Sequence, residues 1–182
     1  LPITPAYFTE RTNGVVFDAV VQRRTVASVF SAVLEREMYR SLRQEGGYSY
    51  AASTSYDPRG DGFATVTAFA DALPDKQDAV LGGFVDLLAK LRVGRIEQAD
   101  LDSVRVKAEE SLRHEEYDAA RLPMAAMNVL TGHPNLAAEA FLDEVRDVTV
   151  DDVQAVAVEA SGSALLLVPA GLNAEWAGYV PA

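Results

Sequence analysis

Apolar residues recur along the chain with two different periods, and these periods predict the order of strands and helices. Gly14–Gln22 is a short Val-rich run that begins at a glycine, which is typical of a largely buried strand. From Thr25 the spacing of apolar residues becomes helical. The predicted helix ends at Gly46-Gly47, because glycine takes the left-handed conformation that ends a helix at no steric cost. This helix carries one apolar stripe, formed by Val26, Phe30, Val33, Leu34, Met38 and Leu42.

The clearest two-strand unit follows this helix. Tyr48–Asp57 and Phe63–Ala70 both have the composition and alternation of strands. The residues that join them, Asp57–Gly62, place proline and glycine where a tight turn needs them. The sequence therefore predicts a β-hairpin over these two runs.

The second half of the chain is mostly helical. One helix opens at Pro74-Asp75 and ends at Gly94, and another covers Gln98–Glu116. Shorter helical pieces cover residues 118–131 and 135–143. A hairpin followed by grouped helices, rather than strict alternation of strand and helix, is typical of an α+β fold.

The chain closes with a helix and a strand. Thr149 is a predicted N-cap for the last helix, and Ser163–Pro169 is a short buried strand. We therefore predict a two-layer α+β sandwich, in which the helices pack on one face of a mostly antiparallel sheet.

Length and composition are those of one domain. The 182 residues suffice to bury a core without a disulfide or a metal ion. We divide them into an extended lead-in (residues 1–13), a folded domain (about residues 14–171) and a weakly patterned tail (residues 172–182). The absence of cysteine excludes disulfides, Cys-ligated zinc and thiol catalysis.

Charge and hydropathy limit the possible partners. Sixteen Lys and Arg residues against 27 Asp and Glu residues give a net charge of −11, which disfavours nucleic acid and anionic membranes as partners. No apolar run is long enough for a membrane span, and the N-terminus is not a signal peptide. A cytoplasmic location is favoured. Because the chain lacks an initiator Met, we expect it to be processed or excised from a longer polypeptide.

The two histidines do not predict a zinc site in this chain. A catalytic zinc needs about three converging His, Asp or Glu ligands, and helical zinc motifs pair two histidines on one face. His114 is followed by Glu115-Glu116 but by no second histidine, and His133 lies in the separate turn Thr131–Asn135. We interpret His114 as a surface residue at a helix end and His133 as a turn residue, and we expect no metal or cofactor on this chain.

A more specific constellation spans the corner between the first helix and the hairpin. Arg43 ends the helix, and Tyr50 lies in the strand that follows Gly46-Gly47. A rigid guanidinium fork and a phenol can converge there on one ligand, and both suit a peptide carbonyl or a developing oxyanion. The alternative is that Arg43 only complements the helix C-terminus and that Tyr50 is a rim residue.

The sequence around this corner resembles the second-half domain of the insulinase (pitrilysin) zinc metallopeptidases, and it is similar to mitochondrial processing peptidase-like domains. The similarity begins in VLEREMYRSLRQEGGYSYAASTSYDPRGDGFATVTAFADALPDKQDAVLGGFVDLLAKL. It continues downstream in RIEQADLDSVRVK and VRDVTVDDVQAVAVEASGSALLLVPAG, and so covers roughly Gly14–Gly171. Its most specific elements are Leu42-Arg43, Gly47 and Tyr50.

This resemblance implies a half-unit fold and a division of labour. Two such halves enclose a chamber, and the zinc and general base lie on an inverted H-x-x-E-H motif of the other half. Arg43 and Tyr50 are then the substrate-binding residues that assist the transition state. Because this chain has no such motif, none of its residues is expected to be catalytic alone. The implied partners are a zinc-bearing half, in the same polypeptide or a separate subunit, a peptide substrate and, in isolation, a second copy of this chain.

Two other functions remain open at this stage. The domain can be a catalytically inactive structural or assembly domain of the same fold, or an unrelated α+β binding domain whose similarity is fortuitous. An H-x-x-E-H motif in the parent gene or in a neighbouring gene favours the peptidase. A fold without a helix-backed antiparallel sheet favours the unrelated domain.

Overall fold

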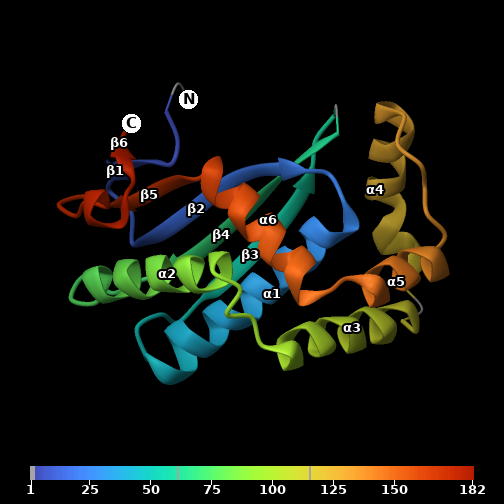
Figure 1. Cartoon of the computed structure of the whole chain (residues 1–182), viewed down its shortest axis with the longest axis horizontal. Helices are drawn as coiled ribbons and strands as arrows, with labels where there is room; N and C mark the ends of the chain where they lie inside the picture. Colours follow the sequence, from blue (N-terminus) through green and yellow to red (C-terminus); the bar gives the residue numbers. More distant parts are fainter. Residues whose placement is uncertain (1–2, 61, 115) are drawn as a thin grey trace.

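The computed structural model describes residues 3–60, 62–114 and 116–182, and one mixed β-sheet forms its base. The strand order is β3-β4-β2-β5-β1-β6 (Figure 1). β4 is antiparallel to β2 and β3, and β2 is antiparallel to β5, whereas β1 is parallel to both β5 and β6. The strands are β1 (Ala6–Glu10), β2 (Gly14–Gln22), β3 (Ala52–Pro58), β4 (Phe63–Asp71), β5 (Leu165–Pro169) and β6 (Val180–Pro181).

The helices form a second layer on one side of this sheet. α1, α2 and α6 lie across the sheet, α3 and α5 pack beside α1, and α4 stands at the margin of the molecule (Figure 1). This arrangement confirms the predicted α+β sandwich. The helices are α1 (Thr25–Met38), which continues into the π-helix η1 (Tyr39–Glu45), α2 (Gln77–Arg92), α3 (Gln98–Leu112), α4 (Tyr117–Thr131), α5 (Ala138–Asp147), α6 (Val150–Gly162) and the 3₁₀-helix η2 (Glu175–Ala177).

The core lies between the two layers. Alternate residues of β2 are buried toward the helices, among them Val15 and Phe17, while Val20 points outward. The predicted apolar stripe of α1 faces them and includes Phe30 and Leu34. Each such side chain contributes about 1.5–3 kcal/mol through its removal from water. The buried face of β2, with its alternating pattern, and the apolar stripe of α1 therefore pack against each other in the core.

The ends of the chain contain more regular structure than the sequence indicates. The lead-in provides β1, which lies between β5 and β6, and the tail provides η2 and β6. Ala6 of β1 is paired with Leu165 of β5, so this pairing joins residues far apart in the chain, and no local pattern announces it. The two termini therefore complete one edge of the sheet.

Several predicted boundaries shift. The third helix ends at Leu112 instead of Glu116, and α2 begins at Gln77. The first hairpin strand begins at Ala52 instead of Tyr48, because the backbone N–H groups of Tyr50 and Ala51 donate to the side chain of Asp71 instead of to a backbone carbonyl of β4. Leu1 and Pro2 of the lead-in, Asp61 of the predicted turn and Glu115 of the predicted helix lie outside the described residues. In the parts of the chain that the structure describes, no helix has the length and apolarity to cross a bilayer.

Candidate functional site

The corner that carries Arg43 is built by a change of helix type. After Met38 the helix widens from the α to the π form, and the backbone N–H of Gly46 donates to the carbonyl of Ser41 at 3.0 Å. Leu42 remains fully buried and anchors the turn in the core. Gly47 has a φ of +60°, the left-handed conformation that favours glycine, so the chain reverses at the predicted stop.

Arg43 and Tyr50 meet at this corner. The guanidinium carbon of Arg43 lies 5.4 Å from the ring centroid of Tyr50 and 4.9 Å from that of Tyr39. Both distances are within the range of cation–π attraction. Arg43 is exposed, and Tyr50 is 81% exposed, so the guanidinium edge and the phenol face solvent. The structure thus brings the two predicted residues together but places Tyr50 just before the strand.

Tyr39 is a member of this cluster that the sequence reading missed. It lies four positions before Arg43, and residues with this spacing are neighbours on a helix surface. The spacing is therefore the signal that could have identified it. Two tyrosine rings, one on each side of the chain reversal, contact the same guanidinium.

Asp71, at the end of β4, holds the segment that bears Tyr50. Its carboxylate accepts hydrogen bonds from the Ser49 hydroxyl at 2.7 Å and from the backbone N–H groups of Tyr50 and Ala51 at 2.8 and 2.7 Å. Its own N–H donates to the Ala51 carbonyl at 3.1 Å. Burial opposes ionisation of Asp71, but these hydrogen bonds prevail and lower its pKa. The backbone under the exposed tyrosine is therefore fixed.

Two buried carboxylates hold the helices beneath the corner. Glu37 is fully buried and forms ion pairs with Arg40 and, at 3.2 Å, with Lys90 of α2. Asp100 of α3 lies 3.0 Å from Arg40 and 3.3 Å from Arg36. Burial disfavours the charge on Arg40, but the attraction of Glu37 and Asp100 prevails and raises its pKa. The neighbouring arginines of this helix are thus engaged in ion pairs, whereas Arg43 is stacked on tyrosine rings.

A cavity of about 530 Å³ opens beside Arg43. Tyr39 and Ala52 line it together with three arginines and two carboxylates, those of Glu35 and Asp100, whereas Tyr50 is not among the lining residues. Arg36 and Arg40 are paired with Asp100, so the guanidinium left to donate to a ligand is that of Arg43. Arg43 can therefore receive an electron-rich group such as a carbonyl oxygen.

The described residues do not fit a zinc ion. His114 follows the end of α3, and His133 lies after α4, where it lines a different cavity. Over residues 3–60, 62–114 and 116–182, no group of three or more His, Asp or Glu side chains is placed to hold a metal. We therefore derive no step through zinc on this chain.

Comparison with known proteins gives a likeness of fold. No family model and no curated protein matches the chain. A protease from Helicobacter pylori matches with a TM-score of 0.70 and 16% identity, over 90% of this chain and 43% of that one. The peptidase M16 inactive domain from Pseudomonas fluorescens has a TM-score of 0.70 and 13% identity, over 90% and 42% of the two chains. The first half of the periplasmic protease PqqL from Escherichia coli has a TM-score of 0.70 and 13% identity, over 95% and 43%.

These matches establish the architecture. The chain has the fold of an insulinase-type (M16) peptidase half-unit, as the sequence predicts, and it spans less than half the length of each of these three proteins. The resemblance to the family is thereby confirmed at the level of fold. The assignment to the second half of such an enzyme stays a prediction.

Proposed function

We propose that this chain is the zinc-free, substrate-binding half of an insulinase-type metallopeptidase. Arg43 and Tyr50 hold the peptide, and a separate zinc-bearing half, in the same polypeptide or on another subunit, carries the metal and the general base. The observation that carries this proposal is the exposed pair at the corner, where the Arg43 guanidinium lies 5.4 Å from the Tyr50 ring centroid.

Each residue has a definite task in this proposal. The guanidinium of Arg43 has five N–H donors, and stacking on two rings restrains its plane without using those donors. It can thus donate to a peptide carbonyl and more strongly to the oxyanion into which that carbonyl develops. The Tyr50 hydroxyl supplies a second donor, on a backbone that Asp71 fixes. A donor set in place before the reaction stabilises the transition state without reorganisation.

A second candidate function has its own support. One of the matching structures is described as an inactive domain of a peptidase of this type. An inactive domain therefore occurs with this fold, and the alternative proposal is that this chain is a catalytically inactive structural or assembly domain. In that case the arginine–tyrosine corner has only a structural role, as part of the chain reversal after η1.

Reconstitution separates the two candidates. The chain is combined with the zinc-bearing half encoded with it, and cleavage of fluorogenic peptides is measured, with each half alone as a control. We expect the Arg43→Ala variant to lower kcat/KM about 100-fold and the Tyr50→Phe variant about tenfold, because each loses a donor to the developing charge. The Arg113→Ala variant, which removes an exposed arginine just after α3, is the matched control and keeps full activity. Cleavage that neither corner substitution alters, or a stable complex without cleavage, contradicts the substrate-binding role and favours the assembly domain.

A further inference from the structure

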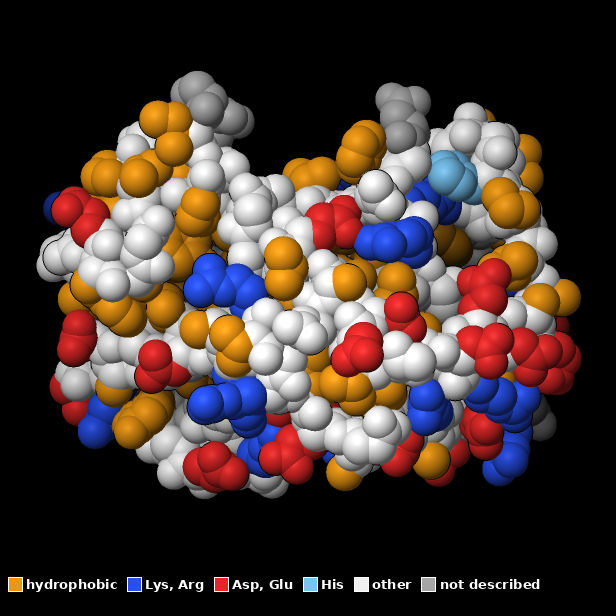
Figure 2. Space-filling view, viewed as in Figure 1, with side chains coloured by type: hydrophobic (Ala, Val, Ile, Leu, Met, Phe, Trp, Pro, Cys, Tyr) orange, Lys and Arg blue, Asp and Glu red, His pale blue; other side chains and the backbone are white. Residues whose placement is uncertain are grey.

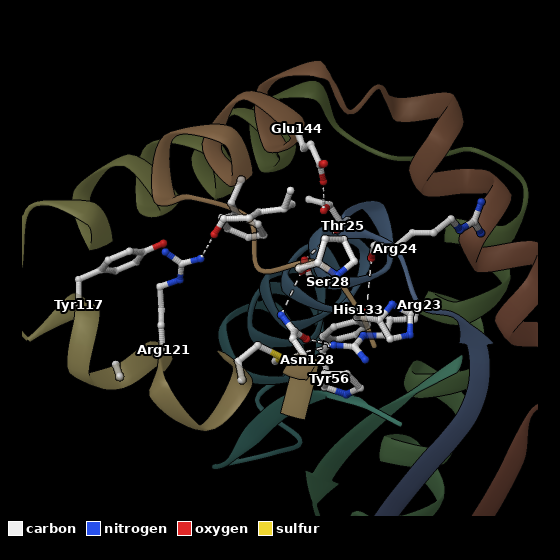
Figure 3. A pocket seen from close by; sticks show the side chains of 16 residues that line it. Arg23, Arg24, Thr25, Ser28, Tyr56, Tyr117, Arg121, Asn128, His133 and Glu144 are labelled. Atoms are coloured by element: carbon white, nitrogen blue, oxygen red, sulfur yellow. Dashed lines mark hydrogen bonds between the residues drawn. The ribbon is translucent and has the colours of Figure 1, made fainter. Parts of the chain in front are cut away.

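A second cavity, of about 540 Å³, lies at the opposite end of α1 from the Arg43–Tyr50 corner. Its walls come from the start of α1, the end of β3, α4, the turn after α4 and α5 (Figure 3). We call it the α4 cavity. Its volume is within the range of about 300–1,000 Å³ that small-ligand sites occupy.

The α4 cavity exists because α4 does not pack into the core. No residue of α4 is fully buried among those the structure describes, although the helix contains several large apolar side chains. Polar bonds attach it to the body at the rim. Arg23 donates to the Thr131 hydroxyl at 3.1 Å. It also donates to the Asn128 side-chain oxygen, and Arg121 donates to the carbonyl of Leu136 (Figure 3). The side chains between these bonds line a hollow.

The lining of the α4 cavity is mainly apolar and aromatic. Its apolar and aromatic side chains include Tyr117 and Met124 of α4, Tyr56 of β3 and Phe141 of α5. The Arg121 guanidinium lies 5.3 Å from the ring centroid of Tyr117, so that its position is restrained. A flat aromatic or branched apolar group can therefore exchange water contacts for contacts with rings and a thioether.

The charges at the α4 cavity favour an anion. Arg23 and Arg121 donate to neutral oxygens, and in the described part of the chain neither forms an ion pair, whereas Arg24 pairs with Glu159 at 2.6 Å. The carboxylate of Glu144 at the rim accepts a hydrogen bond from Thr25. Both guanidinium groups are half-buried. Arg121 donates one hydrogen bond within the described part of the chain and keeps further N–H donors, whereas both terminal nitrogens of Arg23 are already bonded to α4 and to the carbonyl of Arg59, so that Arg23 contributes positive charge. In Figure 2 a histidine and Lys or Arg side chains border the hollow beside α4, with Asp and Glu side chains below them.

We propose that the α4 cavity binds an aromatic or branched apolar group that carries a carboxylate. The apolar group lies among Tyr117, Met124 and Phe141, and the carboxylate accepts hydrogen bonds from Arg121, while Arg23 adds positive charge to the same cavity. An N-acylated amino acid and the C-terminal residue of a peptide both have this chemistry. The proposal does not depend on the function of the Arg43–Tyr50 corner.

Calorimetric titration of the full 182-residue chain tests the required chemistry. The probes are N-acetyl-L-phenylalanine, its amide and N-acetylglycine. We expect saturable binding of the aromatic acid, binding of the amide weakened about tenfold by loss of the charge-assisted hydrogen bonds, and no measurable binding of N-acetylglycine. Equal affinities for acid and amide, or no saturable binding of the aromatic acid, overturn the proposal.

Matched substitutions on one helix locate the binding. Ala120→Trp fills the α4 cavity and abolishes binding of the aromatic acid, whereas Ala126→Trp, on an exposed position of α4 outside the cavity, leaves it unchanged. Arg121→Gln weakens binding of the aromatic acid about tenfold and changes binding of its amide little, and Arg113→Gln is the control. Circular dichroism checks that each variant is folded. Equal loss in both tryptophan variants, or full affinity in Ala120→Trp and Arg121→Gln, places the ligand elsewhere and overturns the proposal.

A third arm identifies the source of the ligand. The peptide Ala-Ala-Ala-Phe with a free C-terminus is compared with N-acetyl-L-phenylalanine and with the amidated peptide. Tighter binding of the free-acid peptide assigns the α4 cavity to peptide C-termini. Tighter binding of the acetylated amino acid assigns it to small free acids, and both outcomes retain the carboxylate chemistry. Tighter binding of the amidated peptide than of the free-acid peptide overturns the proposal that the α4 cavity binds a carboxylate.

Discussion

Helices α1 and α4 have similar apolar content but opposite environments. α1 buries eight residues, including Phe30 and Leu34, between the sheet and the neighbouring helices. Among the described residues of α4 none is buried, and Leu122 and Leu130 are 66% and 83% exposed. Several separate apolar patches are visible at this margin of the molecule in the space-filling view (Figure 2). An apolar helical pattern therefore does not by itself determine burial, because the connections of the chain decide which helix reaches the sheet.

Because α1 is buried and α4 is exposed, substitutions of apolar residues should destabilise the fold in α1 and have little effect in α4. Phe30→Ala is expected to lower the free energy of unfolding by about 3–5 kcal/mol, because it leaves a cavity under the sheet. Leu130→Ala changes that free energy by less than about 0.5 kcal/mol, because the side chain already faces water. Urea denaturation measures both. Similar losses in the two variants would mean that α4 is buried against a partner under the assay conditions.

The buried carboxylate of α1 sharpens the contrast between the two helices. Glu37→Gln removes the carboxylate that pairs with Lys90 and one of the two carboxylates that pair with Arg40, and we expect the free energy of unfolding to fall by about 2–3 kcal/mol. This value is below that for a fully buried pair, since both cations are partly exposed and water screens them. Glu139→Gln, at an exposed position of α5, is the control in the same denaturation assay. A stable Glu37→Gln variant would show that the ion pairs contribute little.

The smallest effect concerns the clamp beneath Tyr50, and it depends on pH. Asp71→Asn is expected to cost about 1–2 kcal/mol at pH 7, because the amide is a weaker acceptor than the carboxylate. The folded-state pKa of Asp71 is lowered, so its contribution is present above the unfolded pKa of about 3.9 and is lost as the pH falls through the folded value. Urea denaturation at pH 7 and pH 3 should show that the difference in the free energy of unfolding between wild type and variant is smaller at pH 3. Asp75→Asn, at an exposed position, is the control. A difference in unfolding free energy that does not depend on pH would contradict a stabilising role of the ionised Asp71 carboxylate.

Local features of the fold could be predicted from the sequence. The stripe of α1 and its end before Gly47 follow from spacing and from the conformational freedom of glycine. Thr149 is the N-cap of α6, and Asp152 completes a capping box with it. The contact between Arg43 and Tyr50 follows from a helix and a hairpin strand that meet at one short corner. In each case the interacting residues lie within a few positions of one another.

Features that depend on distant segments could not be predicted in this way. The pairing of β1 with β5 joins the two ends of the chain, and the Asp71 clamp requires the hairpin register, in which Ala52 lies opposite Ala70. The α4 cavity combines side chains from five segments of the chain. His133 lines it, although the sequence predicts only that His133 is a turn residue. These sites come from tertiary packing.

The proposed function requires Arg43 and Tyr50 to act together on one bound peptide. A double-mutant cycle on kcat/KM in the reconstituted peptidase tests this most directly, with Arg43→Ala, Tyr50→Phe and the double variant measured at equal occupancy of the zinc-bearing half. Two donors to one developing charge are coupled, so we expect the double variant to lose little more activity than Arg43→Ala alone. If the losses of kcat/KM in the two single variants multiply in the double variant, the two side chains act independently and do not share one developing charge.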